Sequence, residues 1–231
     1  MKRGPLIAIE GIDGTGKGTQ ALLLRQALEK AGRKVALFSF PAYEHTLAGA
    51  LIGAYLDGRM GPPRQIDSRF TAVLYALDRF ELKASIEKAR SSGAVVLCDR
   101  WVGSNLAHQA ARTPPRERPA LRRMIERLEF GLFGLPRPDL VVYLDMPDLL
   151  AQQRIRLKAA RGYTKKQMDE LEADRAHLRA ALAEYRRQAR TNRLWRLVRT
   201  VARDGSPRSR EEIHADVLAA LRRRGLLPFS G

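Results

Sequence analysis

The chain has 231 residues, of which 45% are hydrophobic, so one large α/β domain with a sizeable core is the simplest expectation. No apolar run reaches the roughly 18 residues that a membrane-spanning helix needs. The 42 Lys and Arg residues against 25 Asp and Glu give a net charge of +17, which attracts polyanions such as nucleotides, nucleic acid or anionic lipid. Because the basic residues are dispersed, we favour solvated helix faces over a dedicated nucleic-acid surface.

Cysteine usage and the first residues bear on the cellular compartment. Cys98 is the only cysteine, which excludes an intramolecular disulfide. The segment Met1–Pro5 passes directly into an apolar strand and lacks the longer apolar stretch of a secretory signal peptide. We therefore expect a cytoplasmic protein.

Short apolar runs alternate with long amphipathic stretches, which is typical of a parallel sheet with crossover helices. The pattern predicts one doubly wound α/β domain over residues 1–231, with a five-stranded parallel sheet and flanking helices. In chain order the predicted elements are the strand Leu6–Glu10, the helix Thr19–Ala31, the strand Lys34–Phe40, the helices Thr46–Leu56 and Ser68–Ser91, the strand Ala94–Asp99, the helices Gly103–Ala111 and Ala120–Phe130, the strand Leu140–Asp145, the helices Asp148–Ala160 and Met168–Arg190, the strand Leu194–Val201 and the helix Arg210–Arg223.

The segment GIDGTGKGTQ, from Gly11 to Gln20, directly follows the first strand. Its glycines let the backbone curl so that successive N–H groups face inward as an anion-binding nest, and the following helix adds its positive end. Lys17 supplies a charge for the β- and γ-phosphates of a nucleotide. A strand before and a helix after are the context that a phosphate loop requires, so we predict one here.

Gly18 stands where such loops usually carry a Ser or Thr that holds magnesium. Without that hydroxyl, the ion is expected to keep more of its waters, which Mg²⁺ tolerates. The order Lys-Gly-Thr at positions 17–19 resembles that of the adenylate kinases. A loop with this glycine is therefore expected to function.

Five further segments carry a resemblance to a known family. They are FSFPAYEHTLAGALIGAYL (Phe38–Leu56), LYALDRFE (Leu74–Glu81), VVLCDRWVGSNLAHQ (Val95–Gln109), PDLVVYLDMP (Pro138–Pro147) and DGSPRSREEIHADVL (Asp204–Leu218). In this order, over nearly the whole chain, they resemble the thymidylate kinases, which are P-loop nucleoside monophosphate kinases. The resemblance implies ATP-dependent phosphorylation of dTMP to dTDP for dTTP synthesis, the P-loop kinase fold with a small helical lid at about residues 154–172, and a homodimer packed through long helices.

The resemblance implies roles for the residues around the phosphate loop. Arg100 would hold the acceptor phosphate with its planar guanidinium group, and Asp13 would lie near the 3′-hydroxyl of the acceptor sugar. Asp13 and Asp99 would hold Mg²⁺ through its waters, although a structural ion pair is the alternative for Asp99 and Arg100. The predicted ATP-binding residues are Gly11, Ile12, Asp13, Gly14, Thr15, Gly16, Lys17, Gly18 and Thr19, and the predicted catalytic residues are Lys17, Arg100, Asp13, Arg161 and Asp99.

The resemblance also implies a dTMP site. Phe40 and Tyr43 match positions that line the acceptor pocket, with the Tyr43 hydroxyl reaching the phosphate. Tyr75 matches a phenylalanine that stacks on thymine, although a lone helix tyrosine is more often a core residue. Arg79 matches the arginine that bonds a carbonyl oxygen of the base.

Three residues that follow Asp99 and Arg100, the Asp-Arg pair, complete this predicted site. Ser104 and Asn105 match residues that read the base edge, where an amide offers both a donor and an acceptor. His108 stands where many family members have a Tyr or Phe that excludes a 2′-hydroxyl. A lone histidine is more often structural, and that interpretation stays open.

Some thymidylate kinases carry a catalytic arginine within the phosphate loop, at the position of Gly14 here. The basic residues around Gly162 resemble the family's alternative, a lid that closes over the donor phosphates and excludes water. Arg161 is predicted to contact the transition state, and no general base is expected because the acceptor phosphate is already an anion. The other lid residues singled out are Arg154, Arg156, Lys158, Lys165, Lys166, Asp169 and Glu172.

Two alternatives remain at this point. One is another nucleoside monophosphate kinase, acting on dUMP, dCMP or AMP; Gly18 slightly favours AMP, whereas Tyr75 and Arg79 oppose it. The other is a nucleotide-dependent nucleic-acid-binding or regulatory protein that uses the net charge of +17. Such a protein would bind polynucleotides in a salt-sensitive manner.

Overall fold

The computed structural model describes residues 3–160 and 174–227 and contains a five-stranded sheet with strand order β2-β3-β1-β4-β5. All four strand pairs are parallel. The strands are β1 (Leu6–Glu10), β2 (Val35–Ser39), β3 (Val95–Asp99), β4 (Leu140–Asp145) and β5 (Trp195–Arg199). The near-continuous apolar runs of β1, β3 and β4 fit a parallel sheet that is covered on both faces.

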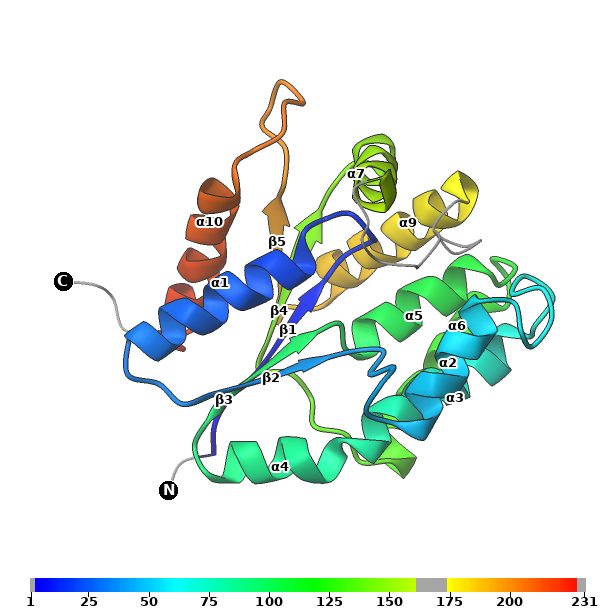
Figure 1. Ribbon diagram of the computed structural model, residues 1–231, viewed down its shortest axis with the longest axis horizontal. Coiled ribbons are helices and arrows are strands. Elements are labelled where there is room, and N and C mark those ends of the chain that lie inside the picture. Colours follow the sequence, from blue (N-terminus) through cyan, green and yellow to red (C-terminus); the bar gives the residue numbers. More distant parts are fainter. Residues whose placement is uncertain (1–2, 161–173, 228–231) are drawn as a thin grey trace.

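Helices cover both faces of the sheet (Figure 1). One face packs against α1 (Lys17–Lys30) and α10 (Arg210–Arg223), through a core that includes Ile7, Leu24 and Val217. The opposite face carries a core that includes Ala8, Trp101 and Tyr185. The helices of the described residues on that side and beyond the sheet edge are α2 (Leu47–Leu56), α3 (Ser68–Glu81), α4 (Lys83–Ser91), α5 (Val102–Ala111), α6 (Arg118–Glu126), α7 (Asp148–Ala160) and α9 (Arg175–Thr191).

The sheet register places the phosphate loop beside the Asp-Arg pair. Ile9 of β1 is paired with Asp99 of β3. The backbone N–H of Arg100 also donates to the carbonyl of Ile9 at 3.0 Å. Because the carboxyl ends of parallel strands meet at one edge, the residues that follow β1 and β3 face the same cleft.

Three predicted helices differ from the observed ones. The single helix expected over Ser68–Ser91 is wrong, since the chain turns at Leu82 and α4 leaves in a new direction that buries Ile86 against the core. The helix expected to end at Phe130 instead continues as a π-helical segment, Arg127–Leu132. Asp174 caps α9 by accepting from the Ala176 N–H, which interrupts the helix expected from residue 168; residues 168–173 lie outside the described part of the chain.

Within the two described ranges, no helix combines the length and the apolarity that crossing a membrane requires.

Candidate active site

The phosphate loop joins β1 to α1 and adopts the backbone expected of an anion nest. Gly14 and Gly16 have φ values of +81° and +89°, a left-handed region that other residues rarely adopt. Gly14 also lies so close to α7 that an added Cβ would sit 2.4 Å from the carbonyl oxygen of Ala151. Neither position accepts a side chain without strain, which explains why both are glycine.

Lys17 begins α1 and turns back toward the loop. Its side chain is only 7% exposed, and its Nζ donates to the carbonyl of Ile12 at 2.9 Å. Nζ also lies 3.7 Å from Oδ1 of Asp13. Burial is the largest influence and lowers the pKa of Lys17, and the charge of Arg100 adds to this lowering. The ammonium group is thus desolvated and held against the loop.

Arg100 and Asp13 form an ion pair at the mouth of the cleft. Arg100 has φ of +69°, the one described non-glycine residue with positive φ, and this conformation directs its side chain across the loop. Its Nη1 donates to the carbonyl of Gly11 at 3.2 Å and to the Ser104 hydroxyl at 3.1 Å. Burial alone would raise the pKa of Asp13, but the charges of Arg100 and Lys17 outweigh burial and hold that pKa well below its usual range.

Glu10 is a site residue that the sequence reading missed. It is fully buried at the end of β1, and its Oε1 accepts from the backbone N–H groups of Trp101 at 2.9 Å and Ser104 at 3.0 Å. Its Oε2 accepts from the Ser104 hydroxyl at 2.6 Å. Burial raises the pKa of Glu10 to about 6, partly offset by Ser104 and Arg100. Glu10 therefore anchors the start of α5 beneath Arg100, a role that its place at the end of an apolar strand did not indicate.

We expect Glu10→Gln to remove a pH dependence of stability. A carboxyl whose pKa rises from 4.5 to about 6 on folding stabilises the fold below pH 4.5, and this contribution is lost as the pH rises through 6. The shift corresponds to about 2 kcal/mol between pH 4.5 and pH 8. Urea unfolding of both proteins measures this. As the pH is raised from 4.5 to 8, the free energy of unfolding of the variant should rise by about 2 kcal/mol relative to that of the parent. A constant difference would contradict the assignment.

Gly18, the loop position without a hydroxyl, lies beside the Asp99 carboxylate. A Cβ at position 18 would lie 3.3 Å from Oδ2 of Asp99, tighter than ordinary contact. Oδ1 of Asp99 is buried and has no hydrogen-bond partner among the described residues. Glycine at position 18 thus leaves room for the Asp99 carboxylate, whose Oδ1 can still accept a hydrogen bond.

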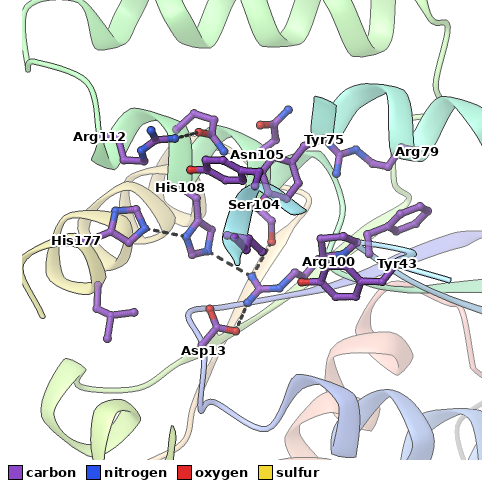
Figure 2. A pocket seen from close by; sticks show the side chains of 16 residues that line it. Asp13, Tyr43, Tyr75, Arg79, Arg100, Ser104, Asn105, His108, Arg112 and His177 are labelled. Atoms are coloured by element: carbon purple, nitrogen blue, oxygen red, sulfur yellow. Dashed lines mark hydrogen bonds and ion pairs between the residues drawn. The ribbon is translucent and has the colours of Figure 1, made fainter. Parts of the chain in front are cut away.

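Beside the phosphate loop lies a cavity of about 750 Å³, part of it open to solvent (Figure 2). All nine residues predicted for the acceptor site line it: Asp13, Phe40, Tyr43, Tyr75, Arg79, Arg100, Ser104, Asn105 and His108. The lining residues that the sequence did not single out are Pro41, Tyr55, Leu56, Gln109, Arg112, His177 and Leu178.

Arg79 and Asn105 meet a partner that the sequence did not reveal. Nε and Nη2 of Arg79 donate to Glu129 at 2.6 and 2.7 Å, and both side chains are at most 1% exposed. Two of the three Arg79 nitrogens are therefore held by Glu129, and only Nη1 is outside this pair. The π-helical segment Arg127–Leu132 directs Glu129 inward to reach them.

The Glu129 contact also fixes the orientation of the Asn105 amide. Its Nδ2 donates to the carbonyl of Ala72 at 3.0 Å and to Glu129 at 2.7 Å. Both partners are acceptors, so the nitrogen must face them and Oδ1 must face away. That Oδ1 is buried without a partner in the described part of the chain, and Asn105 lines the cavity. Asn105 thus holds an unused hydrogen-bond acceptor next to the cavity.

The aromatic residues at the cavity differ in burial. Phe40 is 3% exposed and packs against Trp101 with ring centroids 5.5 Å apart, so it is a wall of the cavity and also part of the core. Tyr43 and Tyr75 are half-buried. Asp78 fixes the loop that carries Tyr43, because it accepts from the Ala42 N–H at 3.1 Å and from the Thr46 hydroxyl at 2.5 Å.

The predicted lid is described only in part. Arg154 is half-buried and Arg156 is exposed on α7. Arg161, the predicted transition-state contact, lies outside the described residues, as do Lys165, Lys166, Asp169 and Glu172, and the structure gives no description of the Lys158 side chain. The role of Arg161 stays a prediction.

A family model described as thymidylate kinase matches residues 9–198 of the chain. The chain belongs to the thymidylate kinase family. The thymidylate kinase of Mycobacterium tuberculosis (strain H37Rv) is 38% identical over 156 residues, which cover 68% of this chain and 72% of that protein. The probable thymidylate kinase of Pyrococcus abyssi is 34% identical over 227 residues, which cover 95% of this chain and 97% of that protein.

The fold has a solved counterpart in the same family. The structure of thymidylate kinase from Candida albicans has a TM-score of 0.71 at 21% identity and covers 97% of this chain and 93% of that chain. The resemblance read from the five sequence segments is confirmed, and so is the doubly wound five-stranded sheet of a P-loop kinase. The thymidylate kinase family match extends from β1 into β5 and so includes the phosphate loop, the Asp-Arg pair and the cavity.

Proposed function

We propose that the chain transfers the γ-phosphoryl group of ATP to the 5′-phosphate of dTMP, with the donor on the phosphate loop and the acceptor in the cavity of Figure 2. The observation that carries this proposal is the position of Arg100. It lines the acceptor cavity and also contacts Asp13 and Gly11 of the phosphate loop, so it stands where two phosphate-bearing ligands would meet. Holding two reactants in line is the main requirement of this chemistry.

On the donor side, the nest over Gly11–Thr19 would hold the phosphates, and Lys17 would stabilise the charge that develops on the transferred group. The ATP base has a candidate site at the carboxyl ends of β4 and β5. A second cleft there is lined by Asp145, Pro147, Arg186, Arg199 and 201–203. We propose that it borders the adenine.

On the acceptor side, the phosphate of the nucleotide would replace Asp13 as the partner of Arg100. It would bind the guanidinium group through two parallel hydrogen bonds. The unpartnered Oδ1 of Asn105 would accept from the N3–H of thymine, and Tyr75 would stack on the ring. Nη1 of Arg79, which takes no part in the two bonds to Glu129, remains for a base carbonyl. The acceptor phosphate needs no general base, since it is ionised near neutral pH.

Asp99 fits an outer contact to Mg²⁺, because its buried Oδ1 accepts hydrogen bonds and lacks a partner among the described residues. No cluster of three or more His, Cys, Asp or Glu residues able to hold a metal occurs in the described ranges, so we propose that nucleotide phosphates and waters supply most of its ligands. When bound, the ion would neutralise charge on the transferring phosphates. Asp13 and Asp99 would orient its waters.

We further propose a cytoplasmic homodimer formed by one kinase domain per chain, with the lid at about residues 154–172. Leu47, Leu51, Phe70 and Phe80, on α2 and α3, are 38–73% exposed, and burying them in a dimer would remove apolar surface from water. Analytical ultracentrifugation decides the oligomeric state.

An ADP-release assay with ATP and Mg²⁺ tests the proposed function, with dTMP, dUMP, dCMP, dGMP, UMP and AMP as acceptors. We expect fast turnover on dTMP, weaker turnover on dUMP and near-background rates on the others, and loss of turnover when EDTA removes the metal. A preference for AMP or dCMP would favour another nucleoside monophosphate kinase. No turnover on any acceptor would favour a binding protein and would direct attention to the basic surface.

A further inference from the structure

The hydroxyl of Tyr185 connects α9 to the guanidinium group of Arg100. The Tyr185 side chain is fully buried, and its hydroxyl oxygen lies 2.8 Å from Oγ of Ser104 and 3.4 Å from Nη1 of Arg100. Tyr185 is absent from the described residues that line the acceptor cavity, whereas Ser104 and Arg100 are among them. An influence of Tyr185 on a ligand in that cavity therefore has to pass through these two neighbours.

Ser104 determines the direction of the hydrogen bonds in this cluster. Glu10, whose pKa is about 6, is ionised at neutral pH and can then only accept, and its Oε2 lies 2.6 Å from Oγ of Ser104. The one Ser104 proton therefore points at Glu10, and Oγ of Ser104 accepts from the Tyr185 hydroxyl. The Tyr185 hydroxyl is also 3.4 Å from Oε2 of Glu10, but Ser104 is the nearer acceptor for its single proton. With Nη1 of Arg100 donating to it at 3.1 Å, the Ser104 hydroxyl is fully used inside the protein.

The two terminal nitrogens of Arg100 have different surroundings (Figure 2). Nη2 pairs with Asp13 at the mouth of the cleft. Nη1 is 3.1 Å from Oγ of Ser104 and 3.2 Å from the carbonyl oxygen of Gly11, so both of its N–H groups have acceptors within the protein. These contacts of Nη1 do not depend on Asp13. They can therefore hold the guanidinium group in place while a phosphate replaces Asp13 at Nη2.

The backbone conformation of Arg100 makes this support more important. Its φ of +69° lies in the left-handed region, which a residue other than glycine keeps when its surroundings over-determine the conformation. The carbonyl of Ile9 fixes the backbone N–H of Arg100, but the long side chain has several rotatable bonds, so its position depends on the partners at its far end. A guanidinium group that is held before the ligand arrives loses less conformational entropy when it binds phosphate.

The hydroxyl of Tyr185 is not needed for packing. The ring stacks on that of Tyr143, with centroids 5.5 Å apart and an interplanar angle of 13°, and it meets the ring of His108 edge-on at 5.9 Å. A phenylalanine would keep both ring contacts and would leave no polar atom to bury. Burial raises the pKa of Tyr185 well above its usual value, and the charge of Glu10 adds to the rise, so the hydroxyl stays a neutral donor. Because its described contacts all belong to the cluster around Arg100, the hydroxyl is expected to serve that cluster.

We propose that Tyr185 is a positioning residue for the acceptor phosphate: its hydroxyl donates to Ser104, and together they hold Nη1 of Arg100 so that Nη2 meets the phosphate in a fixed orientation. This role rests on the proposed function, in which Arg100 binds the phosphate of dTMP. Glu10 orients Ser104 from the other side, so the cluster joins the end of β1 to α5 and α9. Three separate elements thereby determine where one guanidinium group lies, which is the kind of support that precise positioning requires.

A comparison of dTMP with thymidine, which lacks the phosphate, isolates the contact that Arg100 makes. Binding of both ligands is measured by titration calorimetry without ATP. Tyr185→Phe removes the hydroxyl and keeps the ring, and we expect it to weaken dTMP binding about threefold to tenfold, the usual effect of one hydrogen bond. Thymidine binding should change by less than about twofold, because that ligand has no phosphate for Arg100 to hold.

Tyr143→Phe is the matched control for the loss of a hydroxyl. It makes the same change in the ring that stacks on Tyr185, but the Tyr143 hydroxyl donates to Oδ1 of Asp145 at 2.9 Å and not to the cluster around Arg100. In this variant the preference for dTMP over thymidine should stay within about twofold of that of the parent.

Ser104→Ala tests the route by which Tyr185 acts. This substitution removes the atom through which Tyr185 reaches Arg100, so it should reduce the preference for dTMP over thymidine at least as much as Tyr185→Phe does. In the Ser104→Ala background, Tyr185→Phe should lower the preference by less than about twofold more, because the link is already broken. A further loss of threefold to tenfold would contradict the proposed route through Ser104.

Unchanged dTMP binding in Tyr185→Phe, or equal weakening of dTMP and thymidine, would overturn the inference, because the hydroxyl would then have either no effect or only a general effect on the cavity. A parent protein that binds dTMP but does not phosphorylate it counts against the proposed function instead, since the comparison is made without catalysis. A parent protein that binds neither ligand would overturn both.

Discussion

Replacing Lys17 by Ala should lower kcat for dTMP phosphorylation by about 10²–10³-fold, the usual effect of removing one preorganised donor from a developing anion. The Nζ of Lys17 is desolvated, and within the described ranges its contacts are with the loop, at Ile12 and Asp13, so the loop sets its position. Lys17 is absent from the residues that line the acceptor cavity. Binding of dTMP, measured without ATP, should therefore change by less than about twofold.

The matched control is Lys30→Ala, which removes an exposed lysine from the other end of the same helix. It should leave kcat and the melting temperature within error of the parent. A Lys17→Ala protein that retains more than about a tenth of the parent kcat would exclude the donor-phosphate role. Weakened dTMP binding in this variant would instead move Lys17 to the acceptor side.

The parts of the fold that the sequence predicted correctly depend on local pattern. Leu6–Glu10 and Leu140–Asp145 were predicted at their observed bounds, because buried parallel strands are short, continuous apolar runs between polar loops. Positions 14 and 16 have a backbone conformation that glycine adopts readily, so the glycines in the sequence indicate the loop geometry. The nine residues that the family resemblance assigned to the acceptor site all line one cavity, to which the phosphate loop, the segments after β2 and β3, and helices α3 and α5 contribute.

What the sequence did not predict depends on contacts between distant segments. Arg79 was expected to bond the base, yet two of its nitrogens bond Glu129, which is 50 residues away. Nothing in the amphipathic pattern before Leu132 indicates the π-helical turn that directs Glu129 inward, and Leu82 gives no sequence signal of the break between α3 and α4. His177 was unmarked for the same reason, since only the packing of α9 against α5 brings it to His108.

At Gly18 the local sequence pattern and the contacts between distant segments bear on the same question. From the sequence it marks the loss of a metal-binding hydroxyl, and from the structure it marks the close approach of Asp99, whose Oδ2 would be 3.3 Å from a Cβ at that position. The two carboxylates that follow from this arrangement, Asp13 and Asp99, come from different strand ends. If the proposed outer contact to Mg²⁺ holds, a carboxylate at the end of β3 takes over part of the role that a loop hydroxyl has elsewhere.

Glu129→Ala should lower the free energy of unfolding by about 3–5 kcal/mol, because it leaves the Arg79 charge buried and unpaired. Both partners are at most 1% exposed, and Glu129 also accepts from Asn105 at 2.7 Å, so the same substitution removes the contact that fixes the amide. Urea unfolding followed by circular dichroism gives the change. A matched surface control, Glu117→Ala, removes the exposed partner of Arg69 and should cost less than about 1 kcal/mol.

A double variant distinguishes the cost of an unpaired charge from the value of the pair itself. Adding Arg79→Met to Glu129→Ala removes the orphaned charge and should restore at least about 1 kcal/mol of the lost stability. If Nη1 of Arg79 also binds the base, the refolded double variant should still bind dTMP at least about tenfold more weakly than the parent. Recovery of stability together with full dTMP affinity would make the Arg79–Glu129 pair purely structural. No recovery at all would mean that the destabilisation comes from Asn105 and the cavity left at position 129, not from the Arg79 charge.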